Sequence, residues 1–372
     1  MKESVLCVDI GTTSLKAGLI TADGEVVSFS SSKFISSGDR FIAGKWILSL
    51  KSALSEILAK IDMEQVQIKA VTISGNGPTI VSQSEITIRW NENLDLSQFG
   101  ISKDDIEPSL FLPKILVYKN LFNKDFEQIK YIFSGPEYLI YRLTNQAVTI
   151  LPEKRFKTAY WNDQLLEKFD IPVHKLPPFV GIGHICGSLT KEMAIFLKLK
   201  EGLPVISGGP DFVVALIGTK TLKSGRICDR CGSSEGFNFC IPKFLQAPGV
   251  RSLPSVIPNL WNASVLLPNS SSLCESDRLI FAKKALLTLK DLAQKNDIEF
   301  PEYMIVTGGQ AKDVNLMKDK AKYLGMKLYG CQCADAELLG DACAGFVGLG
   351  VFENLAQAAE KLVRTSQLYD DL

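Results

Sequence analysis

Histidine is scarce in this sequence, and its scarcity excludes several kinds of chemistry. The 372 residues contain two histidines, so a multi-histidine metal site is ruled out and a histidine base is not expected. The 41 Lys and Arg residues balance 41 Asp and Glu residues, so net charge draws the chain neither to nucleic acid nor to an anionic membrane. No apolar run approaches the roughly 20 residues of a membrane-spanning helix, and the N-terminus lacks a signal-peptide pattern. We therefore expect a soluble, cytoplasmic protein that binds neither nucleic acid nor membrane and works with carboxylates and backbone groups.

Cysteine is present but is not arranged for a disulfide framework or a zinc site. The nine cysteines are scattered through a long chain and are odd in number. Most lie among apolar neighbours and are expected to be small buried hydrophobic residues. The two closer pairs, Cys228 with Cys231 and Cys331 with Cys333, are too far apart in the sequence for the usual spacing of a structural zinc site.

The first turn of the chain has the composition of a phosphate-binding loop. Val5–Asp9 and Leu15–Ile20 read as strands, and Gly11-Thr12-Thr13-Ser14 connects them. Small residues expose backbone N–H groups that can bind phosphate oxygens, and the threonine hydroxyls add donors. Asp9 at the strand end could hold Mg²⁺ through water. A plain hairpin with an aspartate at its end is the alternative, and this segment alone leaves both interpretations open.

Strands and helices alternate along the chain, which predicts an α/β fold. Ala43–Ile61 has its apolar residues on one helical face, and Ile68–Ile73 reads as a buried strand. A strand, a crossover helix and a second strand form an α/β unit. The apolar spacing over residues 113–143 predicts helix throughout that region.

Further glycine-rich turns follow predicted strands. Gly208-Gly209-Pro210-Asp211 comes directly after Leu203–Ser207 and before a helix. Asp211 could therefore be a general base on a rigid strand end, where glycines let a substrate approach, or it could cap the helix. Two more turns of this kind are Gly232-Ser233-Ser234 and Gly308-Gly309-Gln310-Ala311.

The order of these turns resembles the FGGY carbohydrate kinases, which phosphorylate sugars, polyols and glycerol. The resemblance covers nearly the whole chain. Each motif is weak alone, but together and in this order they are specific. They are Asp9-Ile-Gly-Thr-Thr-Ser14, Ile73-Ser-Gly75, Pro113-Lys114, Tyr141-Arg-Leu-Thr144, Gly208-Gly-Pro-Asp211, Gly232-Ser-Ser234, Gly308-Gly-Gln-Ala-Lys312 and Asp335-Ala-Glu337.

The resemblance implies an α/β fold of two actin-like ATPase domains, also described as ribonuclease H-like, with a cleft between them. An N-terminal domain over residues 1–215 would carry the sugar site and the first phosphate loop. A C-terminal domain over residues 216–372 would carry the second phosphate loop and the adenosine motif, and it looks trimmed. The implied activity is ATP- and Mg²⁺-dependent phosphorylation of a sugar or polyol hydroxyl, with a ketopentose such as xylulose as one candidate. A homodimer is also common in the family.

Roles for individual residues follow from the same resemblance. Asp211 would be the catalytic base, and with Asp9 it would organise Mg²⁺. The substrate would contact Asp211 and three further residues, namely Asn76, Trp90 and Lys114. The nucleotide would contact the two phosphate loops and the adenosine motif, namely Gly11, Thr12, Thr13, Gly232, Ser233, Gly308, Gly309 and Asp313.

Departures from the family pattern keep other functions open. The second phosphate loop has Ser233 where members usually have threonine, and Gln310 replaces a third glycine. The sugar-contacting segment appears as Trp90-Asn91-Glu92, without the usual aspartate and arginine. The alternative is therefore a degenerate, non-catalytic protein that binds nucleotide or sugar. A chaperone-type actin-like ATPase is disfavoured because no sequence remains for a peptide-binding domain.

Overall fold

The computed structural model describes residues 1–372 except 35–37, 103, 233–234, 269–272 and 371–372. The chain divides into two compact units. Unit 1 contains Met1–Thr21, Val27–Asp211 and Ala344–Val351, and unit 2 contains Ala22–Val26, Phe212–Cys343 and Phe352–Leu372. The predicted boundary between residues 215 and 216 and the task assigned to each domain stay predictions.

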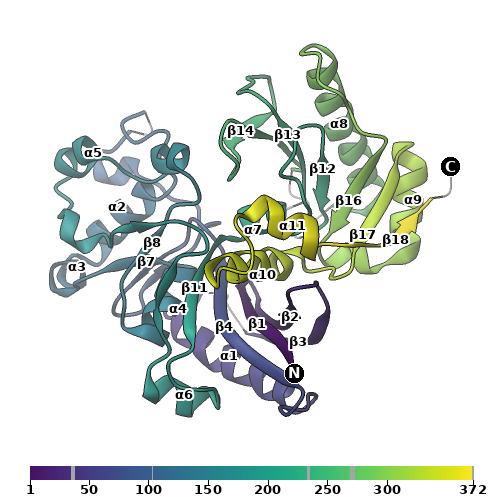
Figure 1. Cartoon of the computed structure of the whole chain (residues 1–372). Helices are drawn as coiled ribbons and strands as arrows, with labels where there is room; N and C mark the ends of the chain where they lie inside the picture. Colours follow the sequence, from purple (N-terminus) through teal and green to yellow (C-terminus); the bar gives the residue numbers. More distant parts are fainter. Residues whose placement is uncertain (35–37, 103, 233–234, 269–272, 371–372) are drawn as a thin grey trace. The chain divides into compact units, whose positions relative to one another are not determined.

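Unit 1 is built around a six-stranded mixed sheet with the order β10-β11-β4-β1-β2-β3 (Figure 1). β1 pairs in parallel with β4, and β4 pairs in parallel with β11, so the carboxyl ends of these three strands meet at one edge. β2 returns antiparallel to β1, which confirms the predicted hairpin. The strands are β1 (Lys2–Ile10), β2 (Ser14–Thr21), β3 (Val26–Lys33), β4 (Val66–Gly75), β10 (Ile185–Ser188) and β11 (Pro204–Pro210).

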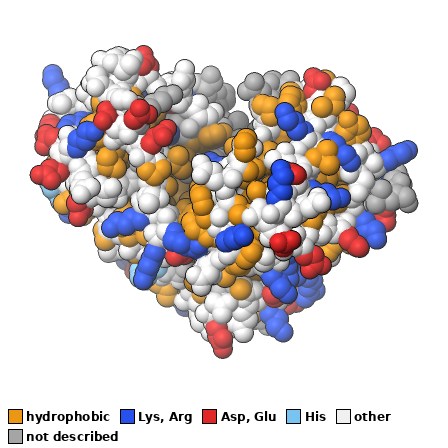
Figure 2. Space-filling model, turned by 90° about the horizontal axis from the view of Figure 1, so that it is seen from above, with side chains coloured by type: hydrophobic (Ala, Val, Ile, Leu, Met, Phe, Trp, Pro, Cys, Tyr) orange, Lys and Arg blue, Asp and Glu red, His pale blue; other side chains and the backbone are white. Residues whose placement is uncertain are grey.

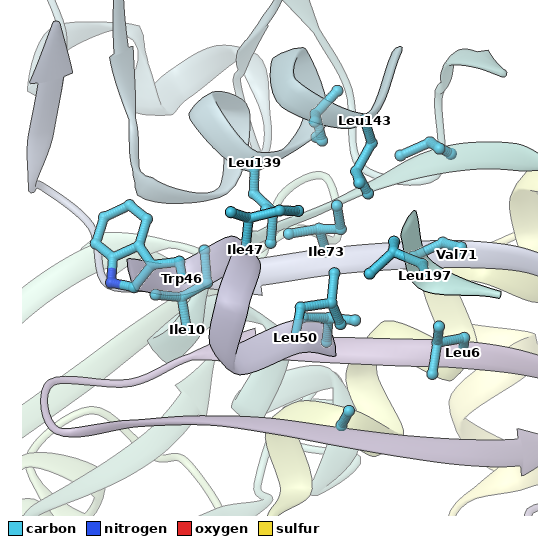
Figure 3. Close-up of a cluster of buried hydrophobic side chains, with 14 of the residues drawn as sticks. Leu6, Ile10, Trp46, Ile47, Leu50, Val71, Ile73, Leu139, Leu143 and Leu197 are labelled. Carbon is cyan, nitrogen blue, oxygen red and sulfur yellow. The ribbon is translucent and has the colours of Figure 1, made fainter. Parts of the chain in front are cut away.

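Apolar side chains from this sheet and its helices form the core of unit 1. Figure 3 shows Leu6, Ile10, Val71 and Ile73 of the sheet beside Ile47 and Leu50 of α1 (Ala43–Leu58). Leu139 and Leu143 of α4 (Gly135–Thr144) belong to the same cluster and are drawn in this view. The predicted helix over 43–61 is confirmed as α1 (Ala43–Leu58), and its buried residues recur at the helical spacing that the sequence shows.

Residues 113–143 differ from the prediction of continuous helix. Within this region β7 (Ile132–Ser134) separates α3 from α4 because Ile132, Phe133 and Ser134 pair with the distant strand β5. Besides α1, the helices of unit 1 are α2 (Leu112–Leu121), α3 (Asn123–Gln128), α4 (Gly135–Thr144), α5 (Asp163–Lys168) and α6 (Lys191–Leu197). The short strands are β5 (Ile80–Ser82), β6 (Thr87–Ile88), β8 (Thr149–Ile150) and β9 (Phe179–Val180), and the 3₁₀ turns are η1 (Ser97–Phe99), η2 (Lys154–Ala159) and η3 (Val173–Lys175).

Unit 2 contains a seven-stranded mixed sheet with the order β14-β15-β13-β12-β16-β17-β18 (Figure 1). β12, β16 and β17 run parallel, and the remaining strands pair antiparallel with their neighbours. The strands are β12 (Ile227–Arg230), β13 (Gly236–Ile241), β14 (Arg251–Pro254), β15 (Trp261–Leu266), β16 (Tyr303–Thr307), β17 (Lys327–Cys331) and β18 (Thr365–Tyr369). The predicted strand before Gly308 is therefore confirmed.

Helices α8 and α9 pack on the unit 2 sheet and share its apolar core. α7 and α10 approach each other closely, since a Cβ on Gly340 would lie 1.9 Å from the Val214 carbonyl oxygen and one on Gly218 would lie 1.9 Å from the Ala336 oxygen. The helices are α7 (Asp211–Gly218), α8 (Glu275–Gln294), α9 (Val314–Leu324), α10 (Ala336–Gly348) and α11 (Leu355–Leu362), and η4 spans Gly309–Lys312.

Most cysteines are buried, as the sequence predicts, and charges of both signs lie on the surface. Cys274 is exposed and the other eight cysteines are buried, all with free thiols. Burial raises the pKa of the Cys228, Cys240 and Cys343 thiols, which are therefore neutral. Figure 2 shows Lys and Arg side chains interspersed with Asp and Glu on the face that it displays. Among the described residues, no helix is both long enough and apolar enough to cross a bilayer.

Candidate functional site

The carboxyl ends of β1, β4 and β11 carry several of the polar residues of unit 1 that the sequence singled out. Ser74 of β4 is paired with Asp9 of β1 on one side and with Gly209 of β11 on the other. Asp211 follows β11 directly and is the first residue of α7. In open α/β sheets, ligands bind outside the carboxyl ends of the strands, so this edge is the candidate site of unit 1.

Asp9 is buried at this edge and lies beside a lysine. Its side chain is 3 % exposed, and the Ser74 hydroxyl donates a hydrogen bond to Oδ1 across 3.5 Å. The Lys16 ammonium lies 3.7 Å from Oδ2, because Lys16 of β2 is directly opposite Asp9 in the hairpin. A carboxylate and an ammonium at the end of one hairpin could hold a cation and an anionic group side by side.

The turn after β1 keeps the form that the sequence predicts. The Gly11 amide donates to the Ser14 carbonyl oxygen across 2.9 Å, and a Cβ on Gly11 would meet that same oxygen at 2.9 Å. Thr13 is exposed at the tip, while Gly11 and Thr12 are half-buried. The Trp90 indole N–H donates to the Thr12 hydroxyl across 3.4 Å. The turn is therefore tight, and Trp90 contacts it.

Asn76, Gly77 and Pro78 form a turn beside the end of β11. The Asn76 amide donates to the Ile10 carbonyl oxygen across 3.0 Å, which places Asn76 against the end of β1. A Cβ on Gly77 would lie 3.4 Å from Pro210, the residue before Asp211. The predicted residues Asn76 and Asp211 are therefore brought to the same edge of the sheet as Asp9.

A small hollow lies between the turn Gly11-Thr12-Thr13 and the segment of residues 89–92, here called the Trp90 segment. Its volume is about 10 Å³, room for about one water molecule, and its polar lining includes Gly11, Thr12, Asn76, Thr79 and Arg89. Trp90 also lines it, together with the apolar side chains of Phe34, Ile42 and Trp46. The structure thus brings Thr12, Asn76 and Trp90 around one concave surface.

The remaining residues of the Trp90 segment bond to one another. The Glu92 carboxylate accepts from the Arg89 amide across 2.7 Å and forms an ion pair with Arg40. Lys114 on α2 is 7 % exposed and does not line the hollow. Burial lowers the pKa of Lys114, and nearby Glu92 offsets part of that effect. Substrate contact by Lys114 stays a prediction.

In unit 2, the turn that follows β12 and carries Gly232 lies against the turn that carries Gly308 and Gly309. Cys231 is shared by both turns, because its amide donates to Thr307 O across 2.7 Å and its carbonyl accepts from the Gln310 amide across 3.1 Å. Gly308 has φ +99°, and a Cβ there would lie 2.7 Å from the Cys231 oxygen, so this close approach needs glycine. Gly232 is adjacent, whereas the predicted contact residue Ser233 lies outside the described residues.

Asp313 caps the N-terminus of a helix, a role that was not predicted from the sequence. It is the N-cap of α9, and its Oδ1 accepts hydrogen bonds from the Asn315 and Leu316 amides, each across 3.1 Å. Its carboxylate therefore satisfies the free amides of the helix start. A contact between Asp313 and adenosine stays a prediction, as it does for Gly309.

The donor set of unit 1 suits a hard divalent cation. Asp9 and Asp211 supply carboxylate oxygens at one sheet edge, which is the ligand type that Mg²⁺ prefers, with water and phosphate oxygens completing its shell. In the described part of the chain, a tight group of metal-type side chains occurs elsewhere, at Asp229, Cys231 and Glu235. The Lys320 ammonium bonds to both carboxylates of that group, so a cation is already supplied by the protein.

Two basic residues at the unit 1 site, Lys16 and Arg89, were not predicted from the sequence. Lys16 could have been found from hairpin register, because a short turn after a strand ending at Asp9 places a residue of the next strand opposite that aspartate. Arg89 gave no such signal, because its place beside Gly11 and Thr12 depends on the fold of a distant segment.

Comparisons with known proteins all find carbohydrate kinases. Residues 105–218 match the N-terminal domain of the FGGY family of carbohydrate kinases. The chain is 24% identical to xylulose kinase of Bacillus subtilis over 263 residues, which cover 62% of this chain and 52% of that protein. It is also 24% identical to glycerol kinase of Mycoplasma capricolum over 282 residues, covering 61% of this chain and 52% of the relative. The chain thus spans about half the length of the curated relatives it matches.

Solved structures share the fold. A ligand-bound xylulose kinase from Lactobacillus acidophilus superposes with a TM-score of 0.78 at 14% identity, covering 99% of this chain and 93% of that chain. Glycerol kinase from Plasmodium falciparum with ADP gives 0.77 at 14% identity, covering 99% and 94%. The fold is therefore the α/β fold with two actin-like ATPase domains. The family match over residues 105–218, the sequence relatives and this fold together show that the chain is similar to the FGGY family of carbohydrate kinases.

Proposed function

We propose that the chain is an ATP-dependent kinase that transfers a phosphoryl group to a hydroxyl of a sugar or polyol. The observation that carries the proposal is the shared edge of β1, β4 and β11, where Asp9, Ser74 and Asp211 follow or end adjacent parallel strands. The relatives named above are xylulose and glycerol kinases. A ketopentose such as xylulose, or a related polyol, is the proposed acceptor.

Each residue at this edge has a defined task in the proposed reaction. Asp211 accepts the proton of the acceptor hydroxyl as its oxygen attacks the γ-phosphorus, and ADP leaves. Lys16 and the turn Gly11-Thr12-Thr13 donate hydrogen bonds to phosphate oxygens. Asp9 and Asp211 would hold Mg²⁺, which would supply positive charge beside the phosphate oxygens. Phosphoryl transfer depends mainly on such positioning and charge neutralisation.

The nucleotide is proposed to contact residues of unit 2 as well. Gly232 and Ser233 would donate to phosphate oxygens, and Gly308, Gly309 and Asp313 would line the adenosine site. The support is the direct hydrogen bonding of the two turns through Cys231. Glycine at 232 and 309 leaves open space where a Cβ would stand, which suits close approach of a ligand to the backbone.

A second function is favoured by one specific observation. Glu92, in the segment that contacts sugar in the family, is held by Arg40 and by the Arg89 amide. The Trp90 indole N–H is likewise used within the chain, by Thr12. If these internal bonds persist with ligand present, the sugar contacts of an active kinase are reduced. The alternative is therefore a non-catalytic protein that binds nucleotide or sugar.

The test measures ADP release with Mg-ATP and a panel of ketoses, aldoses, polyols and aldonic acids. Wild-type protein is compared with Asp211→Asn and with Asp163→Asn, an exposed aspartate of the same unit. Turnover with one acceptor, about 10² to 10⁴ lower in Asp211→Asn and unchanged in the control, supports the kinase and names its acceptor. No acceptor-dependent turnover, with Mg-ATP raising the melting temperature, would favour the non-catalytic alternative. No turnover, with neither Mg-ATP nor any acceptor of the panel raising the melting temperature, would overturn both.

A further inference from the structure

A buried group of acidic and basic side chains lies at the turn that carries Gly232. Asp229 of β12 and Glu235 before β13 are 0 % exposed, and Lys320 of α9 is 2 % exposed. The Lys320 ammonium donates to Glu235 Oε1 across 2.6 Å and also to Asp229 Oδ2. Asp229 and Glu235 bracket the hairpin turn between β12 and β13, so one ammonium joins the two ends of that turn.

Cys231 extends this group to the second turn. Its thiol donates to Asp229 Oδ2 across 3.2 Å and lies 3.6 Å from the Lys320 ammonium. Its backbone amide and carbonyl bind Thr307 and Gln310, which flank Gly308 and Gly309. Lys320 itself is on the helix that begins directly after the Gly308 turn. Side-chain and backbone bonds through Cys231 therefore connect both glycine turns to one buried ammonium.

The charges of this group are balanced by its neighbours. Burial by itself lowers the pKa of Lys320, but Asp229, Cys231 and Glu235 outweigh burial and raise that pKa, so the ammonium stays protonated. Arg278 of α8 lies 3.7 Å from Glu235 Oε2, and the Phe237 ring lies 5.5 Å from the Lys320 ammonium. Removing one partner of such a buried set leaves charge uncompensated, which is far more costly than losing an exposed ion pair.

We propose that Lys320 is a positioning residue for nucleotide binding, which acts through Asp229, Glu235 and Cys231 to hold the Gly232 turn against the Gly308 turn. The proposal rests on the proposed nucleotide contacts of those turns. A core built only from apolar side chains would fill the same space, but it would not fix two backbone turns in one hydrogen-bonded geometry. In some proteins buried polar or ionic groups specify one arrangement of their neighbours, and this is the role proposed for Lys320.

The test compares Lys320→Met with Leu324→Ala, a core variant on the same helix, and with Lys322→Met, which is exposed. Hydrogen–deuterium exchange is measured over residues 228–232 and 306–311, and binding of Mg-ADP is measured by calorimetry. We expect Lys320→Met to raise exchange in both segments together and to weaken Mg-ADP binding at least about ten-fold. Leu324→Ala should lower the melting temperature without raising exchange in the two turns, and Lys322→Met should change nothing.

The outcomes separate this proposal from the proposed function. If Lys320→Met and Leu324→Ala have the same effects, Lys320 only stabilises the fold and the inference is overturned. If wild-type protein does not bind Mg-ADP, the proposed function falls, and the exchange data alone decide whether Lys320 holds the two turns. If Lys320→Met does not fold, Asp229→Asn/Lys320→Met/Glu235→Gln replaces it, since that variant leaves no unpaired carboxylate. In that variant, unchanged exchange in both turns would contradict the inference.

Discussion

The Trp90 indole N–H donates a hydrogen bond to the Thr12 hydroxyl across 3.4 Å, so the segment that carries Trp90 contacts the turn after β1. The two residues come from different parts of unit 1. Trp90 follows β6, whereas Thr12 lies in the turn between β1 and β2. We therefore expect a ligand contact at either residue to affect the other.

Trp90→Phe tests this relationship by removing the N–H group while keeping an aromatic ring. We expect kcat/KM for ATP to fall about 2- to 10-fold, the effect of one lost neutral hydrogen bond. Trp161→Phe is the control, because Trp161 belongs to a buried aromatic cluster away from the turn. Equal losses in the two variants would mean that ring size alone matters.

Lys16→Met tests whether the lysine opposite Asp9 binds the terminal phosphate. Loss of a charge-assisted contact is expected to lower kcat/KM for ATP about 10- to 100-fold. ADP lacks the γ-phosphate, so its affinity should change little, and calorimetry with ADP makes that comparison. Lys69→Met is the control, since Lys69 pairs with Glu3 near the opposite end of the sheet. If ADP affinity falls as much as kcat/KM for ATP, Lys16 does not act on the γ-phosphate.

Glu137 makes stability depend on pH. Its side chain is 2 % exposed and Oε1 accepts from the Ile150 amide across 2.7 Å, and burial raises its pKa from 4.5 to about 7. Between these values the folded state binds a proton that the unfolded chain has released. The free energy of unfolding therefore falls as pH rises from about 4.5 to 7, by up to about 3 kcal/mol from this group.

Glu137→Gln should remove that contribution. We expect the variant to gain stability relative to wild type as pH rises from 5 to 8, as measured by urea unfolding at each pH. Subtracting wild type also removes the similar contribution of Glu235, whose pKa burial and Asp229 raise to about 7. Glu192→Gln, at an exposed position, should run parallel to wild type. A pH-independent difference for Glu137→Gln would contradict the assignment.

Gly340→Ala tests the close packing of α7 and α10. A Cβ at residue 340 would lie 1.9 Å from the Val214 carbonyl oxygen, so the two helices must separate. We expect the free energy of unfolding in urea to fall by about 1–3 kcal/mol or more. Gly181→Ala has open space around its Cβ and should be nearly neutral. Similar values for both variants would show that this approach is not tight in solution.

Local features of the sequence predicted much of the fold and part of the site. The β1–β2 hairpin, α1 and β16 follow from alternation, helical spacing and turn residues that act over a few positions. The carboxylates at strand ends were found in the same way. β7 was not predicted because its apolar residues also fit a helical pattern. It forms a strand because it pairs with β5, which is distant in the sequence.

Long-range contacts account for what the sequence could not show. Lys320 meets Asp229 and Glu235 across most of unit 2, and a lysine in a helix normally reads as a solvated charge. Likewise, Asp313 followed by a helix fits both a ligand contact and an N-cap, and the structure gives the N-cap.

The pairing of Asp9 with Lys16 has a consequence for how this chain can change length. Side chains of a strand alternate between faces, so a shift of β2 by one residue against β1 would exchange Lys16 with a buried neighbour such as Leu15 or Ala17. Hairpin turns of several lengths occur, so an inserted residue can be taken up by the turn without such a shift. Natural or engineered variants that retain both residues should therefore differ in length within the turn and leave the strand residues in register.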